Sequence, residues 1–158
     1  MVVRIIGCGN VDRGDDAAGV LVVRRLRALE TAGVEVGERS GESFSLMESW
    51  IGWYHVILVD ATAPHGMPGR ILVWNALADQ LPEDIFSCST HGFGVREAVE
   101  LARAMNRLPQ RLLIYGIEGK QFDLGAPLSP EVEGAVESVA QQLRQQVRNS
   151  AELSVALP

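Results

Sequence analysis

The stretch over residues 2–20 joins an apolar run to a helical pattern through a glycine-rich, acidic turn, and it constrains the fold more than any other part of the chain. Residues 2–6 are few and mostly β-branched, so they predict a buried strand rather than a helix. Gly7 and Gly9 end that strand, because glycine tolerates a tight turn and lets another group approach the main chain. Helical spacing of apolar residues follows over residues 15 to about 31. The chain therefore opens as a strand–turn–helix unit.

Strand and helix patterns continue to alternate along the chain. Four further strands are expected, at residues 34–39 as an edge strand, 55–60, 70–74 and 111–117. Three further helices are expected, with these apolar faces: Phe44, Met47 and Ile51 in the first; Ala98, Val99, Ala102 and Met105 in the second; Val132, Val136, Val139, Leu143 and Val147 in the third. Ser129 and Pro130 suit the N-cap and first position of the third.

This alternation predicts a three-layer α/β sandwich, in which helices flank a twisted, mostly parallel sheet of about five strands. The loop over residues 61–69 is too short for a helical crossover, so the strand after it should run antiparallel or lie elsewhere in the sheet. We therefore expect a mixed sheet. Residues 1–148 are expected to form a single domain and residues 149–158 a frayed tail.

Composition restricts the class of protein. With 158 residues, 47% of them hydrophobic, the chain can bury an ordinary core. A net charge of -6 disfavours a surface for nucleic acid or for anionic membranes. No apolar run is long enough for a membrane span and no signal-peptide pattern is present, so we expect a cytoplasmic protein. Cys8 and Cys88 form no C-x-x-C motif, so neither a disulfide framework nor a thiolate zinc site is indicated.

Acidic residues and a histidine follow several of the expected strands, and loops at the carboxyl ends of parallel strands gather into one crevice. Asp16, Asp60 and His91 would suit a divalent transition metal such as nickel or zinc. Each also has an ordinary structural explanation: Asp16 as a partner of the helix dipole, Asp60 in an Asx turn, and His91 as a capping or hydrogen-bonded surface residue. His55 and His65 are weaker candidates, because one opens a strand and the other lies in a Pro-His-Gly turn.

The glycine turn also invites a dinucleotide-binding interpretation, which the acids disfavour. The G-x-G-x-x-G pattern needs glycine at position 12, where this chain has Asp12. Asp15 and Asp16 add negative charge at the helix N-terminus that a phosphate would occupy. We expect Asp15 to cap the helix instead.

A cysteine nucleophile is a further alternative. Cys88 lies three residues from His91, and Cys8 lies inside the glycine turn. Cysteine is more often a small buried apolar residue, so we expect that state for both.

Six short motifs are ordered along residues 2 to about 145. They are Gly7-Cys8-Gly9-Asn10, Arg13-Gly14-Asp15-Asp16-Ala17-Ala18-Gly19, Leu58-Val59-Asp60-Ala61, Ser89-Thr90-His91-Gly92-Phe93-Gly94, Tyr115-Gly116-Ile117-Glu118 and Leu128-Ser129-Pro130. Together they resemble the hydrogenase maturation proteases, the endopeptidases that remove the C-terminal extension from the large-subunit precursor of [NiFe] hydrogenases.

The resemblance implies a metal-binding, catalytic set of Asp16, Asp60 and His91. The family often has glutamate at the first of these positions, so the Asp16 side chain is one methylene shorter than the side chain usual there. Nickel would come from the precursor, the expected partner, and no organic cofactor is implied. The nickel could polarise the peptide carbonyl or activate water, or it could only dock the substrate while Asp16 or Asp60 acts as general base. The alternatives are a non-catalytic chaperone for the precursor and a nucleotide-binding α/β enzyme.

Overall fold

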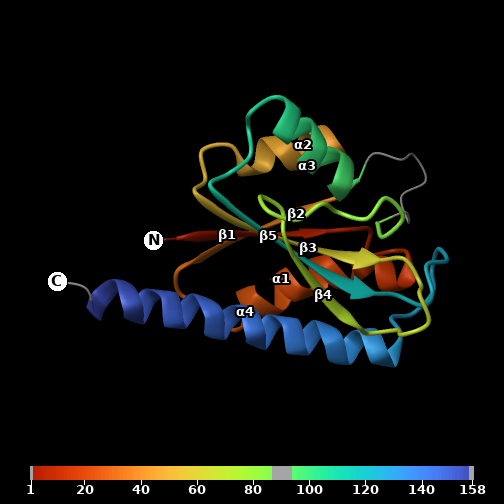
Figure 1. Cartoon of the computed structure of the whole chain (residues 1–158). Helices are drawn as coiled ribbons and strands as arrows, with labels where there is room; N and C mark the ends of the chain where they lie inside the picture. The colour runs from red at the N-terminus through yellow and green to blue at the C-terminus, as the bar shows by residue number, and fades with distance from the viewer. Residues whose placement is uncertain (1, 87–93, 157–158) are drawn as a thin grey trace.

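The computed structural model, which describes residues 2–86 and 94–156, is built around one five-stranded sheet (Figure 1). The strand order is β2-β1-β3-β5-β4. The strands are β1 Val3–Cys8, β2 Val34–Arg39, β3 His55–Thr62, β4 Ile71–Asn75 and β5 Arg111–Glu118. All neighbouring pairs are parallel except β4 with β5, which is antiparallel. The mostly parallel mixed sheet and the edge position of β2 are therefore confirmed.

Helices cover both faces of the sheet, which gives the predicted three layers (Figure 1). The helices are α1 Ala18–Ala28, α2 Ser43–Trp50, α3 Val95–Ala104 and α4 Pro130–Ala156. The apolar side chains of α1 and α4 share one core with alternate residues of β1, β3 and β5. Those of α2 and α3 share a second core with the remaining alternate residues. This division follows from the period of two along each strand.

The first predicted helix is interrupted near its start. Residues Gly14–Ala17 form a short 3-10 helix, and α1 begins only at Ala18. A Cβ on Gly19 would collide with the carbonyl oxygens of Val59 and Cys8. Glycine at position 19 thus lets α1 pack directly on the main chains of β1 and β3.

Two predicted helix faces need correction at their ends. In α2 the buried residues include Met47, as predicted, together with Leu46 and Trp50, whereas Phe44 is 58% exposed and Ile51 is 50% exposed. Ile51 follows the last residue of α2 in an extended conformation, so helical spacing no longer decides where its side chain points. Met105 likewise follows the end of α3 and is exposed.

The last helix is longer than predicted. Its five predicted apolar residues are all buried against the sheet. The helix continues to Ala156, past residue 149 where the sequence predicts a frayed tail. Hydrogen bonds from Gln145 to Asn149 and from Ser150 to the Gln146 carbonyl support the helix around residue 149. Among the described residues, no helix is long and apolar enough to cross a membrane.

Candidate active site

Asp16 and Asp60 come together at the carboxyl edge of the sheet. Asp16 lies in the 3-10 turn after β1, and Asp60 lies near the end of the neighbouring strand β3. Val56 and Leu58 belong to the core beneath α2 and α3, so alternation along β3 places Asp60 toward the same layer. The two carboxylates are close enough that the charge of Asp16 raises the pKa of Asp60. The structure thus brings together two of the three predicted site residues.

The Asp16 carboxylate is partly buried and accepts one hydrogen bond from the part of the chain that the structure describes. Its Oδ2 accepts from the Asn10 backbone N–H at 2.9 Å. Burial raises the pKa of Asp16, and the Asn10 hydrogen bond and the Arg13 charge oppose that rise without cancelling it. This acid therefore holds a negative charge less readily than an ordinary aspartate does.

Asp60 is perturbed more strongly. Burial, and then the neighbouring Asp16 charge, hold the pKa of Asp60 well above its usual value, while a hydrogen bond from the Ala61 N–H opposes the shift. In both carboxylates one oxygen accepts no hydrogen bond from the described residues. A proton or a cation between the two acids would relieve this unfavourable pairing of charges.

Cys8, at the end of β1, faces the same two acids and is fully buried. Burial raises the pKa of its thiol, and the charges of Asp60 and Asp16 raise it further. A neutral, enclosed thiol is a poor nucleophile. The structure therefore supports the apolar, structural interpretation of Cys8.

The third predicted ligand, His91, lies outside the described residues, as does Cys88. Among residues 2–86 and 94–156, no group of three or more His, Cys, Asp or Glu side chains could hold a metal ion. The full ligand set therefore stays a prediction. Of the other histidines, His55 is buried at the far end of β3, and His65 is exposed and contacts the Ala63 carbonyl at 2.9 Å.

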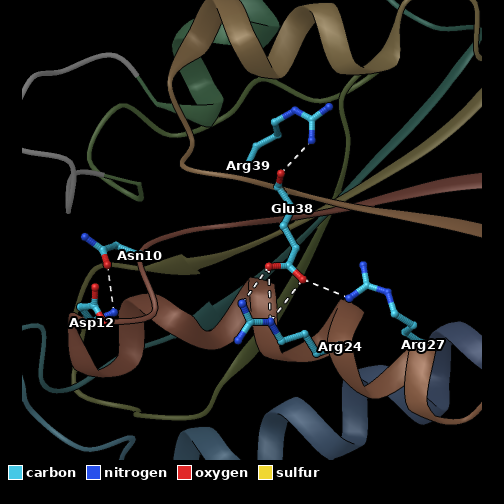
Figure 2. A network of polar contacts seen from close by, with 6 residues as sticks. All are labelled: Asn10, Asp12, Arg24, Arg27, Glu38 and Arg39. Atoms are coloured by element: carbon cyan, nitrogen blue, oxygen red, sulfur yellow. Dashed lines mark hydrogen bonds and ion pairs between the residues drawn. The ribbon is translucent and has the colours of Figure 1, made fainter.

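The glycine turn and the start of α1 carry internal hydrogen bonds and ion pairs. Figure 2 shows an Asx turn in which the Asn10 side chain accepts from the Asp12 N–H at 2.9 Å. Figure 2 also shows Arg24 and Arg27 on α1, both bonded to the Glu38 carboxylate of β2. These arginines are engaged in holding α1 to the sheet edge. The arrangement gives the dinucleotide interpretation no support.

Asp15 does not cap the helix, contrary to the prediction. It is fully buried, and neither the 3-10 turn nor α1 has a side-chain cap. Its carboxylate instead accepts hydrogen bonds from Lys120, Gln121 and Ser129. Burial alone would raise the pKa of Asp15, but these bonds outweigh it and the pKa lies below its usual value. Asp15 is thus a buried, well-bonded carboxylate.

Glu118, at the end of β5, is a buried acid whose role sequence reasoning missed. It is 1% exposed, and its Oε2 accepts from the backbone N–H groups of His65 and Met67 at 3.1 and 2.5 Å. An available signal was its place at the end of an apolar strand, the same signal that identified Asp60. Glu118 thus holds the loop that follows Asp60.

The family model for HycI, described as hydrogenase maturation protease, matches residues 20–146. This chain belongs to the hydrogenase maturation protease family. The matched range includes Asp60 and the position of His91, and Asp16 lies just before it.

Two curated relatives and a solved structure are similar to this chain over most of its length. The Escherichia coli protein named Hydrogenase 2 maturation protease is 24% identical over 155 residues, which cover 95% of this chain and 93% of the relative. Protein FrxA of Pyrococcus furiosus is 32% identical over 131 residues, 78% of this chain and 88% of the relative. The fold also resembles the crystal structure of the [NiFe] hydrogenase maturation protease HycI from Thermococcus kodakarensis, with a TM-score of 0.71 and 26% sequence identity. That similarity covers 93% of this chain and 92% of the Thermococcus chain. The protein is therefore a peptidase of the hydrogenase maturation protease family.

Proposed function

We propose that this peptidase removes the C-terminal extension of a [NiFe] hydrogenase large-subunit precursor, and that it recognises nickel already seated in that precursor through Asp16, Asp60 and His91. The observation that carries the proposal is that Asp16 and Asp60 follow neighbouring parallel strands at the carboxyl edge of the sheet, near enough for the charge of Asp16 to raise the pKa of Asp60. The names of the Escherichia coli and Thermococcus relatives support hydrogenase maturation as the process.

The donor set fits a divalent cation on physical grounds. Two interacting acids, each with a carboxylate oxygen free of hydrogen bonds from the described residues, suit a positive charge between them. Carboxylate and imidazole ligands together are compatible with nickel. The cation would enter as part of the substrate, so selection for nickel-loaded precursor would need no metal resident in the protease.

The chain itself contributes binding and proton transfer. Bound nickel supplies Lewis-acid polarisation of the peptide or of a water molecule. A carboxylate with a raised pKa is better matched to proton transfer near neutral pH than an ordinary aspartate is, and Asp60 has the stronger shift. We therefore assign Asp60 as the general base if nickel only docks the substrate, with Asp16 as its electrostatic partner.

Substitution of the three residues tests this proposal. Asp16→Asn, Asp60→Asn and His91→Ala proteins should fold and yet leave a nickel-loaded precursor at its full mass. Asp123→Asn is the matched control, because Asp123 is exposed and its side chain accepts no hydrogen bond from the described residues. The control should shorten the precursor as the wild type does. Full cleavage by all three site variants would overturn the assignment.

The same experiment separates the enzyme from a chaperone. Mass spectrometry after incubation with wild-type protein should show the precursor shortened at its C-terminus. A stable complex with a precursor of unchanged mass would contradict the proposal and favour a binding module.

A further inference from the structure

Two buried carboxylates that the proposed chemistry does not use, Asp15 and Glu118, lie beside the candidate acids. We propose that they are positioning residues: Asp15 holds the turn that carries Asp16, and Glu118 holds the loop that follows Asp60. Both act through one common anchor, the end of β5 and the residues directly after it, 118–121. This inference rests on the proposed function, since it concerns the same two acids.

Asp15 is bonded on both carboxylate oxygens. Its Oδ1 accepts from the Ser129 N–H at 2.7 Å. Its Oδ2 accepts from the Lys120 N–H at 2.8 Å, the Gln121 N–H at 2.9 Å and the Ser129 hydroxyl at 2.8 Å. The main chain adds a fifth contact, because the Asp15 N–H donates to the Gln121 carbonyl at 2.8 Å. Charge-assisted bonds of this kind are roughly twice as strong as neutral ones, so the turn is tied firmly to the segment after β5.

Close backbone contacts leave the Asp16 turn little room to move. A Cβ on Gly9 would collide with the Asp16 carbonyl oxygen, and a Cβ on Gly14 would collide with the Gln121 carbonyl oxygen. A Cβ on Gly119 would lie 3.1 Å from the Asp15 Cβ. Gly9 thus lets the turn close on itself, and Gly14 and Gly119 let the turn and the segment after β5 approach at main-chain distance. The hydrogen bonds of Asp15 hold these two segments together.

Glu118 secures the other side of the site. Besides its two side-chain bonds to the loop, its N–H donates to the Arg70 carbonyl at 2.9 Å and its carbonyl accepts from the Gly69 N–H at 2.7 Å. The next residue, Gly119, donates its N–H to the Thr62 carbonyl at 3.0 Å. The loop over residues 63–70 is therefore attached to Glu118 in its middle and at its far end, and the last residue of β3 before it is bonded to Gly119.

Such attachment matters because catalytic groups must be held to within about 0.5 Å of their productive positions. A misplacement of about 1 Å can cost roughly a hundredfold in rate. Substitution of Asp15 or Glu118 can therefore lower the rate of cleavage even if neither residue touches the substrate. Their effect would pass through Asp16 and through the loop beside Asp60.

The chemistry of the two carboxylates predicts different responses to amide substitution. Both bonds of Glu118 go to one oxygen, so the carbonyl oxygen of Glu118→Gln can accept both, whereas Glu118→Leu loses both. Asp15 uses both oxygens, so Asp15→Asn must turn an N–H₂ group toward a backbone N–H or the Ser129 hydroxyl. We expect kcat/KM for nickel-loaded precursor to fall about tenfold to a hundredfold in Asp15→Asn and Glu118→Leu. Glu118→Gln should stay within about threefold of wild type.

A second measurement separates positioning from general stability. Activities are compared per folded molecule, well below the melting temperature of each variant, with Asp123→Asn as control. In Asp15→Asn the Asn10 amide, whose N–H donates to Asp16, should exchange with solvent faster while core amides of β3 keep their protection. If Asp15→Asn does not fold, Ser129→Ala removes only one of the four side-chain bonds and should show a smaller loss in the same direction.

Lower melting temperatures with wild-type kcat/KM and unchanged Asn10 exchange would overturn the inference and leave Asp15 and Glu118 with purely structural roles. Failure of the proposed function itself has a different signature. In that case wild-type protein would not shorten the precursor, or Asp16→Asn would cleave it normally.

Discussion

At the scale of single residues, hydrogen-bond donors separate the acids into two kinds. Asp15 and Glu118 each accept hydrogen bonds from two or more backbone N–H groups, which hold their side chains in place. Asp16 and Asp60 each receive one backbone hydrogen bond from the described residues, and the charge of Asp16 raises the pKa of Asp60. Buried charges without compensation are costly and cluster at functional sites. The contrast is the physical reason to place function on the second pair.

Asp60→Asn should stabilise the folded protein at neutral pH. Because the pKa of Asp60 is raised in the folded state, the folded protein keeps this proton to higher pH than the unfolded chain does. Asp60 therefore costs stability as pH rises above the unfolded value near 4. Asparagine keeps the hydrogen bond from the Ala61 N–H without the charge. We expect the free energy of unfolding at pH 7 to rise, with the gain shrinking toward pH 4.

Urea unfolding of wild type and Asp60→Asn between pH 4 and pH 8 measures this effect. A variant that is less stable than wild type at pH 7, or a gain that grows on acidification, would show that the Asp60 charge is compensated in the folded protein.

At the scale of elements, the contact of α1 with the sheet positions the Asp16 turn. A Cβ on Gly7 would collide with the Gly19 carbonyl oxygen, and a Cβ on Gly19 would collide with the Val59 carbonyl oxygen. The helix thus rests on the backbones of β1 and β3 rather than on their side chains. Any residue larger than glycine at either position must push α1, and the turn before it, away from the sheet.

Gly19→Ala should be strongly destabilising, by about 2 kcal/mol or more, since the obstructing atoms are backbone and cannot rotate away. Gly134→Ala in α4 is the matched control. A Cβ there meets nothing within 4 Å, so the change should stabilise the protein by up to about 1 kcal/mol through helix propensity. Chemical denaturation measures both, and equal effects of the two substitutions would contradict the close contact of α1 with the sheet.

The sequence predicts the strands of this protein better than it predicts the contacts around its candidate active site. The strands were predictable because apolar runs and alternation are local, and β2 has the predicted bounds. Asp60 was predictable from its place at the end of such a run. The roles of Asp15 and Ser129 were not, because their bond joins residues 114 positions apart. The exposed Ile51 was missed because helical spacing gives no warning of where a helix stops.

At the scale of the whole molecule, two cores share one sheet. Trp50 belongs to the core between the sheet and helices α2 and α3, and Trp53 and Trp74 pack against that core. Tyr115 and Leu143 belong to the core on the opposite face, between the sheet and helices α1 and α4. Since alternate residues of the same strands enter both cores, loss of one core should disrupt the other.

Unfolding should therefore be a single cooperative transition, with tryptophan fluorescence and far-ultraviolet circular dichroism giving one midpoint. Leu143→Ala, on the face opposite the tryptophans, should lower both midpoints equally, at a cost of about 2–5 kcal/mol. A fluorescence transition that stays in place while the dichroism transition shifts would mean that the two faces unfold separately, and that residues 1–148 are not one domain.

The most direct test of the central claim is the mass of a [NiFe] hydrogenase large-subunit precursor after incubation with this protein, with and without nickel in the precursor. We predict loss of the C-terminal extension from the nickel-loaded precursor alone, and no loss from either form with Asp60→Asn protein. Equal cleavage of the nickel-free precursor by the wild type would contradict recognition of nickel by the Asp16 and Asp60 pair.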